Sequence, residues 1–478
     1  MSTISVMRVL SASSLGALTS AALLLTTGLP AAAATSAHAT TGTATTGTAA
    51  LGTAGAPGAP DRAPRMPGAG STQSLPLTSL TPSDRGPRTG ADGALGLAPR
   101  TVKPFSLLGV VWEDADAELT GRVQVRTRTA GTDRWSPWRE LDTHSGDAPD
   151  HGREEQTGGA ARGATAPLWV GPSDGVQVRV ERAADAARTD GTARTDSAAE
   201  GAAHAGAATG AEAGAAPGAL PEGLRLELVD PGDTKAASGA AEPGGETGGA
   251  VIPPLTRTET DAEAAARGLG IEFAEGGKHV GPRPGIVTRS GWGANERLRE
   301  SGYAYGKTVR AAFVHHTAMG NDYRCSQAPS IIRSIYRYHV KSSGWRDIGY
   351  NFLVDKCGKI YEGRAGGVTE PVQGAHTYGF NTNTMGVAVL GSFGKSKPSK
   401  KALDGVAKLT AWKLGLYGVN ARGKTTMTSG GGKYAKGKRV RMNTISGHRD
   451  GFNTECPGAR LYERLDTIRA TAGRLQGR

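Results

Sequence analysis

The sequence predicts an α/β protein: a C-terminal domain with a central mixed β-sheet flanked by about three helices, preceded by a small all-β domain and disordered linkers. Residues 284–478 alternate apolar strand-like runs with segments of helical periodicity. Residues 101–230 contain strand-like segments only. The remaining stretches are rich in Ala, Gly, Thr and Pro. Such stretches have too little apolar surface to offset the entropy lost on ordering, so they predict linkers.

The N-terminus has the pattern of a secretory signal. Arg8 is the only early charge, and the apolar stretch Leu15–Leu29 is followed by small residues through Ala39. We therefore expect residues 1–39 to be a signal peptide that is removed on export. A membrane anchor is the alternative, but the apolar core is short and interrupted by Ser and Thr, so we expect no stable membrane span. Residues 40–100 are predicted to be a disordered linker.

Residues 101–230 are predicted to form a β-sandwich-like domain. Its strands are expected at Leu107–Trp112, Arg122–Thr129, Leu168–Val170, Val176–Val180 and Leu224–Leu228. A low-complexity insertion at 183–219 interrupts them. Trp112, Trp135 and Trp138 have two interpretations, and core packing is favoured over a surface that stacks on sugars. We expect no catalytic residues in this domain.

A second linker is predicted at 231–283, with a short helix at Asp261–Leu269. The C-terminal domain at 284–478 is long enough for one well-buried core. Its strands are expected at Thr308–His316, Ile348–Val354 and Thr384–Leu390, with a turn and its partner strand at Gly358–Arg364. Helical periodicity predicts helices at Pro329–Lys341, Ser399–Leu416 and Leu461–Leu475.

The charge is distributed unevenly. From residue 284 onward the chain has 32 Lys/Arg against 12 Asp/Glu, and the whole chain has a net charge of +12. A basic domain on an exported protein suggests an anionic partner, and export favours a wall polymer or membrane surface over nucleic acid. The Gly-rich basic stretch Lys424–Arg441 predicts a mobile loop. A solvated insertion is favoured there over attraction to anionic wall polymers.

A histidine and a cysteine lie eight positions apart in the segment Gly447–Gly458, at His448 and Cys456. Imidazole nitrogen and thiolate sulfur are ligands that zinc prefers. A further pair, His315 and His316, ends a strand, where adjacent side chains point to opposite faces, so only one can easily face the site. His315, His448 and Cys456 would bind Zn²⁺ and leave a fourth position for water or substrate.

Such a zinc site activates water and polarises a carbonyl, which are the two needs of amide hydrolysis. The negative charge that develops on the carbonyl oxygen also needs a hydrogen-bond donor. Tyr350 is a candidate donor, and Thr454 could add a hydroxyl near the metal. These residues alone predict a secreted zinc amide hydrolase.

The same residues resemble the peptidoglycan recognition proteins, which share a fold with type-2 N-acetylmuramoyl-L-alanine amidases and amidase-type phage lysozymes. The segments that carry the resemblance are Val314–Thr317, Gly344–Phe352, Gly358–Arg364, Gly374–His376 and Gly447–Gly458. The resemblance implies a mixed sheet with three helices and a zinc ion at the floor of a groove. It also implies cleavage of the amide between N-acetylmuramic acid and L-alanine of the peptidoglycan stem peptide.

Residue roles follow from the resemblance position by position. It implies metal ligands at His315, His448 and Cys456, and a catalytic tyrosine at Tyr350. Thr454 takes only a supporting role, because this position differs among the family's catalytic members. Trp345 and His376 fall where the family lines its glycopeptide groove, with core packing as the alternative for each. Family members without amidase activity typically lack the metal cysteine, which this chain keeps.

The chain has three cysteines, and outside the cell an odd count needs a reason. Metal binding by Cys456 would leave Cys325 and Cys357 to form a disulfide. We expect a monomer that is secreted or associated with the cell wall and acts on peptidoglycan. A non-catalytic peptidoglycan-binding protein is the main alternative, a zinc endopeptidase is a third, and nothing but charge supports a nucleic-acid partner.

Overall fold

The structure is a computed structural model. It describes residues 70–81, 94–143, 147–150, 161–182, 219–232, 249–268 and 279–478. The predicted signal peptide at 1–39 lies outside these residues. The predicted insertion at 183–219 also lies outside them, except for its last residue. None of the helices in the described ranges is long and apolar enough to cross a membrane.

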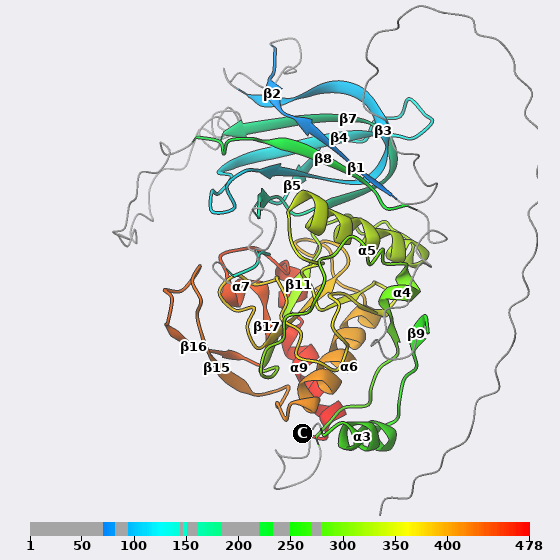
Figure 1. The fold of residues 1–478 in the computed structure, drawn as a ribbon, viewed down its shortest axis with the longest axis vertical. Helices are drawn as coiled ribbons and strands as arrows, with labels where there is room; N and C mark the ends of the chain where they lie inside the picture. The colour runs from blue at the N-terminus through cyan, green and yellow to red at the C-terminus, as the bar shows by residue number, and fades with distance from the viewer. Residues whose placement is uncertain are drawn as a thin grey trace, which may run out of the picture. The chain divides into compact units, whose positions relative to one another are not determined.

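The N-terminal domain is all-β, as predicted (Figure 1). Its antiparallel sheet has the order β1-β8-β3-β7-β4-β5, and β2 and β6 pair with β3. The strands are β1 (Ser71–Pro76), β2 (Thr78–Ser79), β3 (Leu95–Trp112), β4 (Gly121–Thr129), β5 (Arg139–Leu141), β6 (Gly163–Ala164), β7 (Leu168–Arg182) and β8 (Arg225–Asp230). The two predicted strands at Leu168–Val170 and Val176–Val180 are parts of the single long strand β7.

The prediction of a linker at 40–100 is wrong for its described C-terminal part. Strands β1 and β2 and the start of β3 belong to the sheet. Strand β1 pairs with β8 along its whole length, from Ser71 opposite Asp230 to Pro76 opposite Arg225. A polar segment such as β1 gains its order from this distant partner, which local composition does not reveal.

The tryptophans of this domain divide between two environments. Trp112 is buried in the domain core, and its Nε1 donates a hydrogen bond to the Ala117 carbonyl oxygen (2.8 Å). The core interpretation therefore holds for Trp112. Trp135 and Trp138 are half-buried, with the Arg126 guanidinium 5.1 and 5.2 Å from their ring centroids.

The C-terminal domain contains the predicted mixed sheet. Its strand order is β17-β11-β14-β12-β13-β10-β9, with antiparallel pairing at β12–β13 and β10–β9 and parallel pairing elsewhere. The strands are β9 (Val251–Ile252), β10 (Ile286–Val287), β11 (Ala311–His316), β12 (Phe352–Val354), β13 (Ile360–Glu362), β14 (Thr384–Val389) and β17 (Ile445–Gly447).

Three helices pack on the faces of this sheet: α5 (Ala328–Arg337), α6 (Lys400–Leu416) and α9 (Leu465–Gln476). A π-helical turn at Tyr338–Ser342 extends α5. The other helices of the described residues are α3 (Arg257–Ala266), α4 (Arg289–Trp292), α7 (His448–Gly451) and α8 (Ala459–Tyr462). The single helix predicted at Leu461–Leu475 is therefore two helices, α8 and α9.

Alternation along the strands places helices on both faces of the sheet. In β14, Val387 and Val389 pack in one core cluster with α6 and α9, whereas Ala388 packs in another cluster with α5. Phe352 and Leu353 of β12 divide in the same way. Successive strand side chains point to opposite faces, so α6 and α9 cover one face and α5 covers the other.

Two predictions near the edges of this domain need correction. The predicted linker at 231–283 contains β9, which pairs with β10, and α3, which begins at Arg257 rather than Asp261. Thr256 and Glu259 form a capping box that fixes this earlier start. The predicted loop at Lys424–Arg441 is instead part of a hairpin of β15 (Lys424–Thr428) and β16 (Arg439–Asn443).

The all-β domain docks on helix α5. Leu107, Val111 and Val229 of its sheet share a core cluster with Ile335 and Tyr338. The hydroxyl of Tyr338 donates a hydrogen bond to the carbonyl oxygen of Thr165 (3.1 Å). The contact is close at Gly109 of β3, where an added Cβ would lie 2.3 Å from the Tyr338 hydroxyl oxygen. Apolar burial and this close fit hold the two domains together.

Candidate metal centre

The structure brings the three predicted metal ligands together. His315 lies near the C-terminal end of β11, and His448 directly follows β17. Because β11 and β17 are parallel neighbours, with Val314 opposite Gly447, the two histidines leave the sheet at the same edge. One ligand atom from each of His315, His448 and Cys456 lies within 4.8 Å of the others, and all three side chains are buried.

The segment after His448 turns back and places Cys456 beside the histidines. The amide nitrogen of Arg449 donates a hydrogen bond to the Cys456 carbonyl oxygen (3.0 Å), which closes the loop. Thr454 accepts a hydrogen bond from the Cys456 amide nitrogen through its hydroxyl (3.1 Å) and lies at the edge of the site. His448 begins the short helix α7.

The separations between donor atoms fit a tetrahedral metal ion. With usual zinc bond lengths, two nitrogen or oxygen ligands would lie about 3.3 Å apart, and sulfur and nitrogen about 3.6 Å apart. The Sγ of Cys456 lies 3.8 Å from Nδ1 of His315. Burial lowers the pKa of His315 to about 3, so its imidazole is neutral, which is the form that binds metal. The donor set is therefore suited to zinc.

A carboxylate that the sequence did not predict also faces this site. Asp147, in the segment 147–150 of the N-terminal domain, places its Oδ1 3.0 Å from Nδ1 of His315 and 3.4 Å from Nδ1 of His448. No catalytic residues were predicted in this domain, and the contact of Asp147 with the predicted ligands is a finding of the structure alone. No local pattern marks Asp147, because its partners lie more than a domain away along the chain.

Tyr350 also contacts Asp147 beside the predicted metal ligands. Its hydroxyl donates a 2.7 Å hydrogen bond to Oδ2 of Asp147, and its ring centroid is 5.4 Å from that of His315. Burial, followed by the nearby Asp147 charge, raises the pKa of Tyr350 well above its usual range. The phenol therefore stays protonated and keeps a hydrogen that it can donate.

Residues that would not touch the metal themselves contact His315 on the side away from Asp147. The Thr377 hydroxyl oxygen lies 3.4 Å from Nε2 of His315 and 3.0 Å from Nδ1 of His376. Asn381 accepts hydrogen bonds from the amide nitrogens of both His376 and Thr377 through one oxygen (2.7 and 2.9 Å). Thr377 and Asn381 are thus supporting residues that the sequence did not predict.

The two predicted groove residues differ in position. His376 is fully buried, and its ring packs edge-on against that of His315 at 5.3 Å. Trp345 packs on His339 with 4.3 Å between ring centroids and borders a cavity of ≈ 270 Å³. Tyr378 and Phe452 line the same cavity.

His316, the neighbour of His315, donates its amide hydrogen to Sγ of Cys456 (3.3 Å), so its backbone supports the thiolate.

The cysteines divide as predicted. Cys325 and Cys357 form a disulfide, and Cys456 is free and buried. The disulfide ties the start of α5 to the turn between β12 and β13. Burial and the nearby Asp147 charge raise the pKa of the Cys456 thiol well above its usual range, so a cation is needed to hold it as a thiolate.

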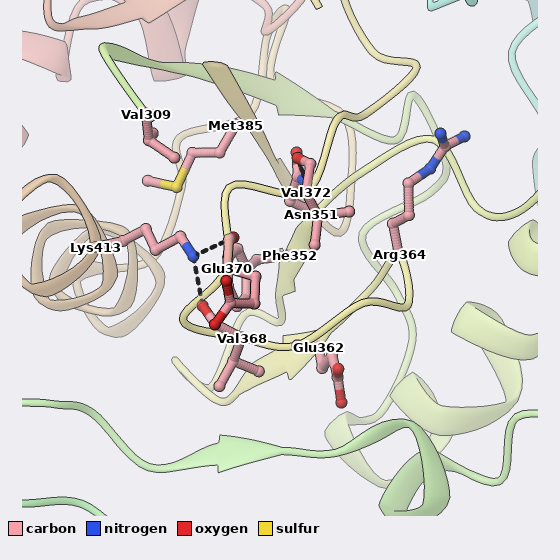
Figure 2. Close-up of a pocket in the computed structure, with 11 residues that line it drawn as sticks. Val309, Asn351, Phe352, Glu362, Arg364, Val368, Glu370, Val372, Met385 and Lys413 are labelled. Carbon is pink, nitrogen blue, oxygen red and sulfur yellow. Dashed lines mark hydrogen bonds between the residues drawn. The ribbon is translucent and has the colours of Figure 1, made fainter. Parts of the chain in front are cut away.

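Another small cavity, beside helix α6, contains a buried lysine. Figure 2 shows Lys413 donating hydrogen bonds from Nζ to the carbonyl oxygens of Val368 and Glu370 (2.6 and 2.8 Å). The cavity measures only ≈ 10 Å³, about the space of one water molecule. Lys413 therefore stabilises the loop that precedes β14, and the metal centre remains the candidate functional site.

The mixed sheet and the site at its edge define the class as an amidase-type α/β domain. Residues 305–459 match the N-acetylmuramoyl-L-alanine amidase family. Residues 60–205 match a family described as Rv3811 N-terminal galactose-binding domain-like. The peptidoglycan-recognition protein SC2 of Drosophila simulans is 33% identical over 184 residues, which are 38% of this chain and 85% of that protein. The chain therefore belongs to the peptidoglycan recognition protein and type-2 amidase family.

Other similar proteins cover the same part of the chain. Human peptidoglycan recognition protein 3 is 29% identical over 184 residues, 38% of this chain and 46% of its own length. The solved structure of Drosophila PGRP-LB is 27% identical, covering 38% of this chain and 92% of that chain, with a TM-score of 0.31. The amidase LysC of Clostridium intestinale is 23% identical, covering 35% and 89%, with a TM-score of 0.26.

Proposed function

We propose that the C-terminal domain is a zinc-dependent N-acetylmuramoyl-L-alanine amidase, which hydrolyses the amide between N-acetylmuramic acid and L-alanine in peptidoglycan. One observation carries the proposal: Cys456 lies with His315 and His448 at ligand distance, beside the buried hydroxyl of Tyr350. The family match adds amidase chemistry, and the names of the relatives add peptidoglycan as the polymer recognised.

The three ligands would hold the zinc ion, which when bound would activate water and polarise the amide carbonyl. Tyr350 supports this chemistry as a protonated donor aimed at the negative charge that develops on the carbonyl oxygen. Thr454 orders the loop that presents Cys456. We assign Trp345, which borders the cavity of ≈ 270 Å³, to the substrate groove, where its aromatic ring would contact the sugar or peptide. The fully buried His376 fits the packing alternative instead.

Digestion of purified sacculi, with mass spectrometry of the soluble products, tests the proposal. The protein should release stem peptides that carry a free L-alanine amine, and Cys456→Ser or a chelator should abolish this release. His448→Gln should also abolish it, whereas His279→Gln, at a half-buried histidine that bonds the Gln476 carbonyl oxygen, should not. Binding to sacculi without release would support the non-catalytic alternative, and cleavage inside the stem peptide would indicate an endopeptidase.

Location and assembly belong to the same proposal. We expect export through the N-terminal signal, because the substrate lies outside the cytoplasm, and action as a monomer at the cell wall. The basic hairpin β15–β16 would favour approach to anionic wall polymers. Fractionation of cells that express the full chain, followed by immunoblotting, would show the protein in the medium or wall fraction; retention in the cytoplasm would contradict this.

A further inference from the structure

We propose that Asp147 of the N-terminal domain is a fourth ligand of the metal and holds the centre in a closed state. In that state, segment 147–150 occupies the position that water and the substrate carbonyl need. This inference rests on the proposed function, since it concerns access to the same metal. It assigns a role to a domain that lies outside the amidase family match.

The two carboxylate oxygens of Asp147 face different groups: Oδ1 faces the two histidines, and Oδ2 faces Tyr350. Its buried Oδ1 lies 3.0 Å from Nδ1 of His315 and 3.4 Å from Nδ1 of His448, yet it has no hydrogen-bond partner among the described residues. These two separations are close to the roughly 3.3 Å expected between nitrogen and oxygen ligands of one tetrahedral zinc ion. The Oδ2 accepts the hydrogen bond of Tyr350.

One carboxylate therefore takes both positions that an amide substrate would use. Its Oδ1 takes the place of the activated water. Its Oδ2 accepts the Tyr350 hydrogen bond that the substrate carbonyl oxygen would otherwise accept. Carboxylate oxygen is an ordinary zinc ligand and would complete a four-coordinate site. A site with four protein ligands has the closed arrangement of a structural centre, whereas catalysis needs one open position.

The segment that carries Asp147 is anchored at its other end. Asp150 accepts hydrogen bonds through Oδ1 from the Gly379 amide nitrogen (2.7 Å) and from Nδ2 of Asn381 (3.0 Å). Asn381 also donates to the carbonyl oxygen of Ala148 (2.9 Å). Asn381 is the residue whose oxygen orders Thr377 behind His315. The segment is thus seated on the same loop that supports the metal site.

Docking of the whole N-terminal domain keeps the segment in place. Besides the shared apolar core on α5, Ser342 donates a hydrogen bond through its hydroxyl to Glu227 (3.0 Å), and the Arg162 amide donates to the Ser343 carbonyl oxygen (3.1 Å). An occupant tethered in this way competes with substrate at a high effective concentration. The centre opens when the segment withdraws, so any partner or cleavage that releases the N-terminal domain would activate the enzyme.

Azide binding to the cobalt-substituted full-length protein tests this arrangement without using activity. Azide needs an open coordination position, and its binding changes the visible spectrum of Co²⁺. We expect Asp147→Ala to bind azide at least about tenfold more tightly than the wild type, because the wild-type site is rarely open. Asp133→Ala, at an exposed carboxylate of the same domain, is the matched control and should behave as wild type.

Asp150→Ala provides a second variant that leaves the metal donors intact. It should raise azide affinity in the same direction as Asp147→Ala, because it removes the anchor on Gly379 and Asn381. Equal azide affinity in wild type, Asp147→Ala and Asp150→Ala would overturn the inference. Both variants should also digest sacculi faster than wild type. If all of them bind one metal ion but none releases stem peptides, the proposed function fails, while the azide result still decides the role of Asp147.

Discussion

Tyr350 donates a 2.7 Å hydrogen bond from its hydroxyl to Oδ2 of Asp147, across a sequence separation of 203 residues. The bond joins the predicted catalytic donor of the C-terminal domain to a carboxylate of the N-terminal domain. A buried phenol needs an acceptor, and a buried carboxylate needs donors or a cation, so this bond meets a need of both groups. If Asp147 closes the site as proposed, this contact between the domains would control access to it.

Removal of the Tyr350 hydroxyl should reduce turnover. In Tyr350→Phe the developing negative charge loses its donor, so we expect kcat on sacculi to fall roughly 10²–10³-fold while zinc content stays unchanged. The comparison is best made in the Asp147→Ala background, because the hydroxyl also holds the closing segment. Turnover equal to that of Asp147→Ala alone would remove Tyr350 from the mechanism.

The disulfide should be detectable by thiol counting. Denatured protein without reductant should show one free thiol, from Cys456, because Cys325 and Cys357 are bonded. Reduction should lower the free energy of unfolding by about 2–5 kcal/mol, since the reduced chain gains freedom in the unfolded state. Three free thiols without reductant would contradict the pairing.

A substitution at the domain contact should open the site from a distance. In Gly109→Ala the new Cβ would lie 2.3 Å from the Tyr338 hydroxyl oxygen, so the buried Tyr338 ring must move, which disturbs the contact between β3 and the π-helical turn after α5. We expect faster limited proteolysis between the domains and faster digestion of sacculi. Tyr338→Phe removes one hydrogen bond without adding volume and should have a smaller effect. Unchanged proteolysis and activity in Gly109→Ala would show that domain docking does not control access.

Stability should fall on mild acidification. Burial lowers the pKa of His339 to about 3, and its Nδ1 accepts a hydrogen bond from the Gly349 amide (3.1 Å). The folded state keeps this imidazole neutral, whereas the unfolded chain protonates it near pH 6.5. The neutral imidazole therefore contributes fully to the free energy of unfolding above pH 6.5, and this contribution is lost as the pH falls toward 3. Urea unfolding at several pH values should show a shallower pH slope for His339→Gln; an identical slope would contradict this assignment.

The parts of the site that could be predicted are those marked by local chemistry. His448 and Cys456 share one short segment, and the strand that ends in His315 and His316 is strongly apolar, so pattern and ligand preference were sufficient to predict these three residues as candidate ligands that the fold brings together. The mixed sheet followed from the same strands. The hairpin β15–β16 was missed because Met427 and Met442 pack on Phe313 and Phe380, a tertiary contact that the polar, glycine-rich sequence does not suggest.

Asp147 could not be predicted for a different reason. Nothing in its neighbourhood distinguishes it from the other carboxylates of the first domain, and its role depends on how that domain docks on α5. The same is true of strand β1, whose order depends on β8 about 150 residues later along the chain. Contacts of this kind are set by tertiary packing, so only the folded chain reveals them.

The most direct test of the amidase assignment is the identity of the amine released from purified sacculi. End-group mass spectrometry of a digest by Asp147→Ala should reveal stem peptides that begin with free L-alanine, with Asp147→Ala/Cys456→Ser as the matched inactive protein. Absence of such peptides from a protein that holds one zinc ion per chain would contradict the account.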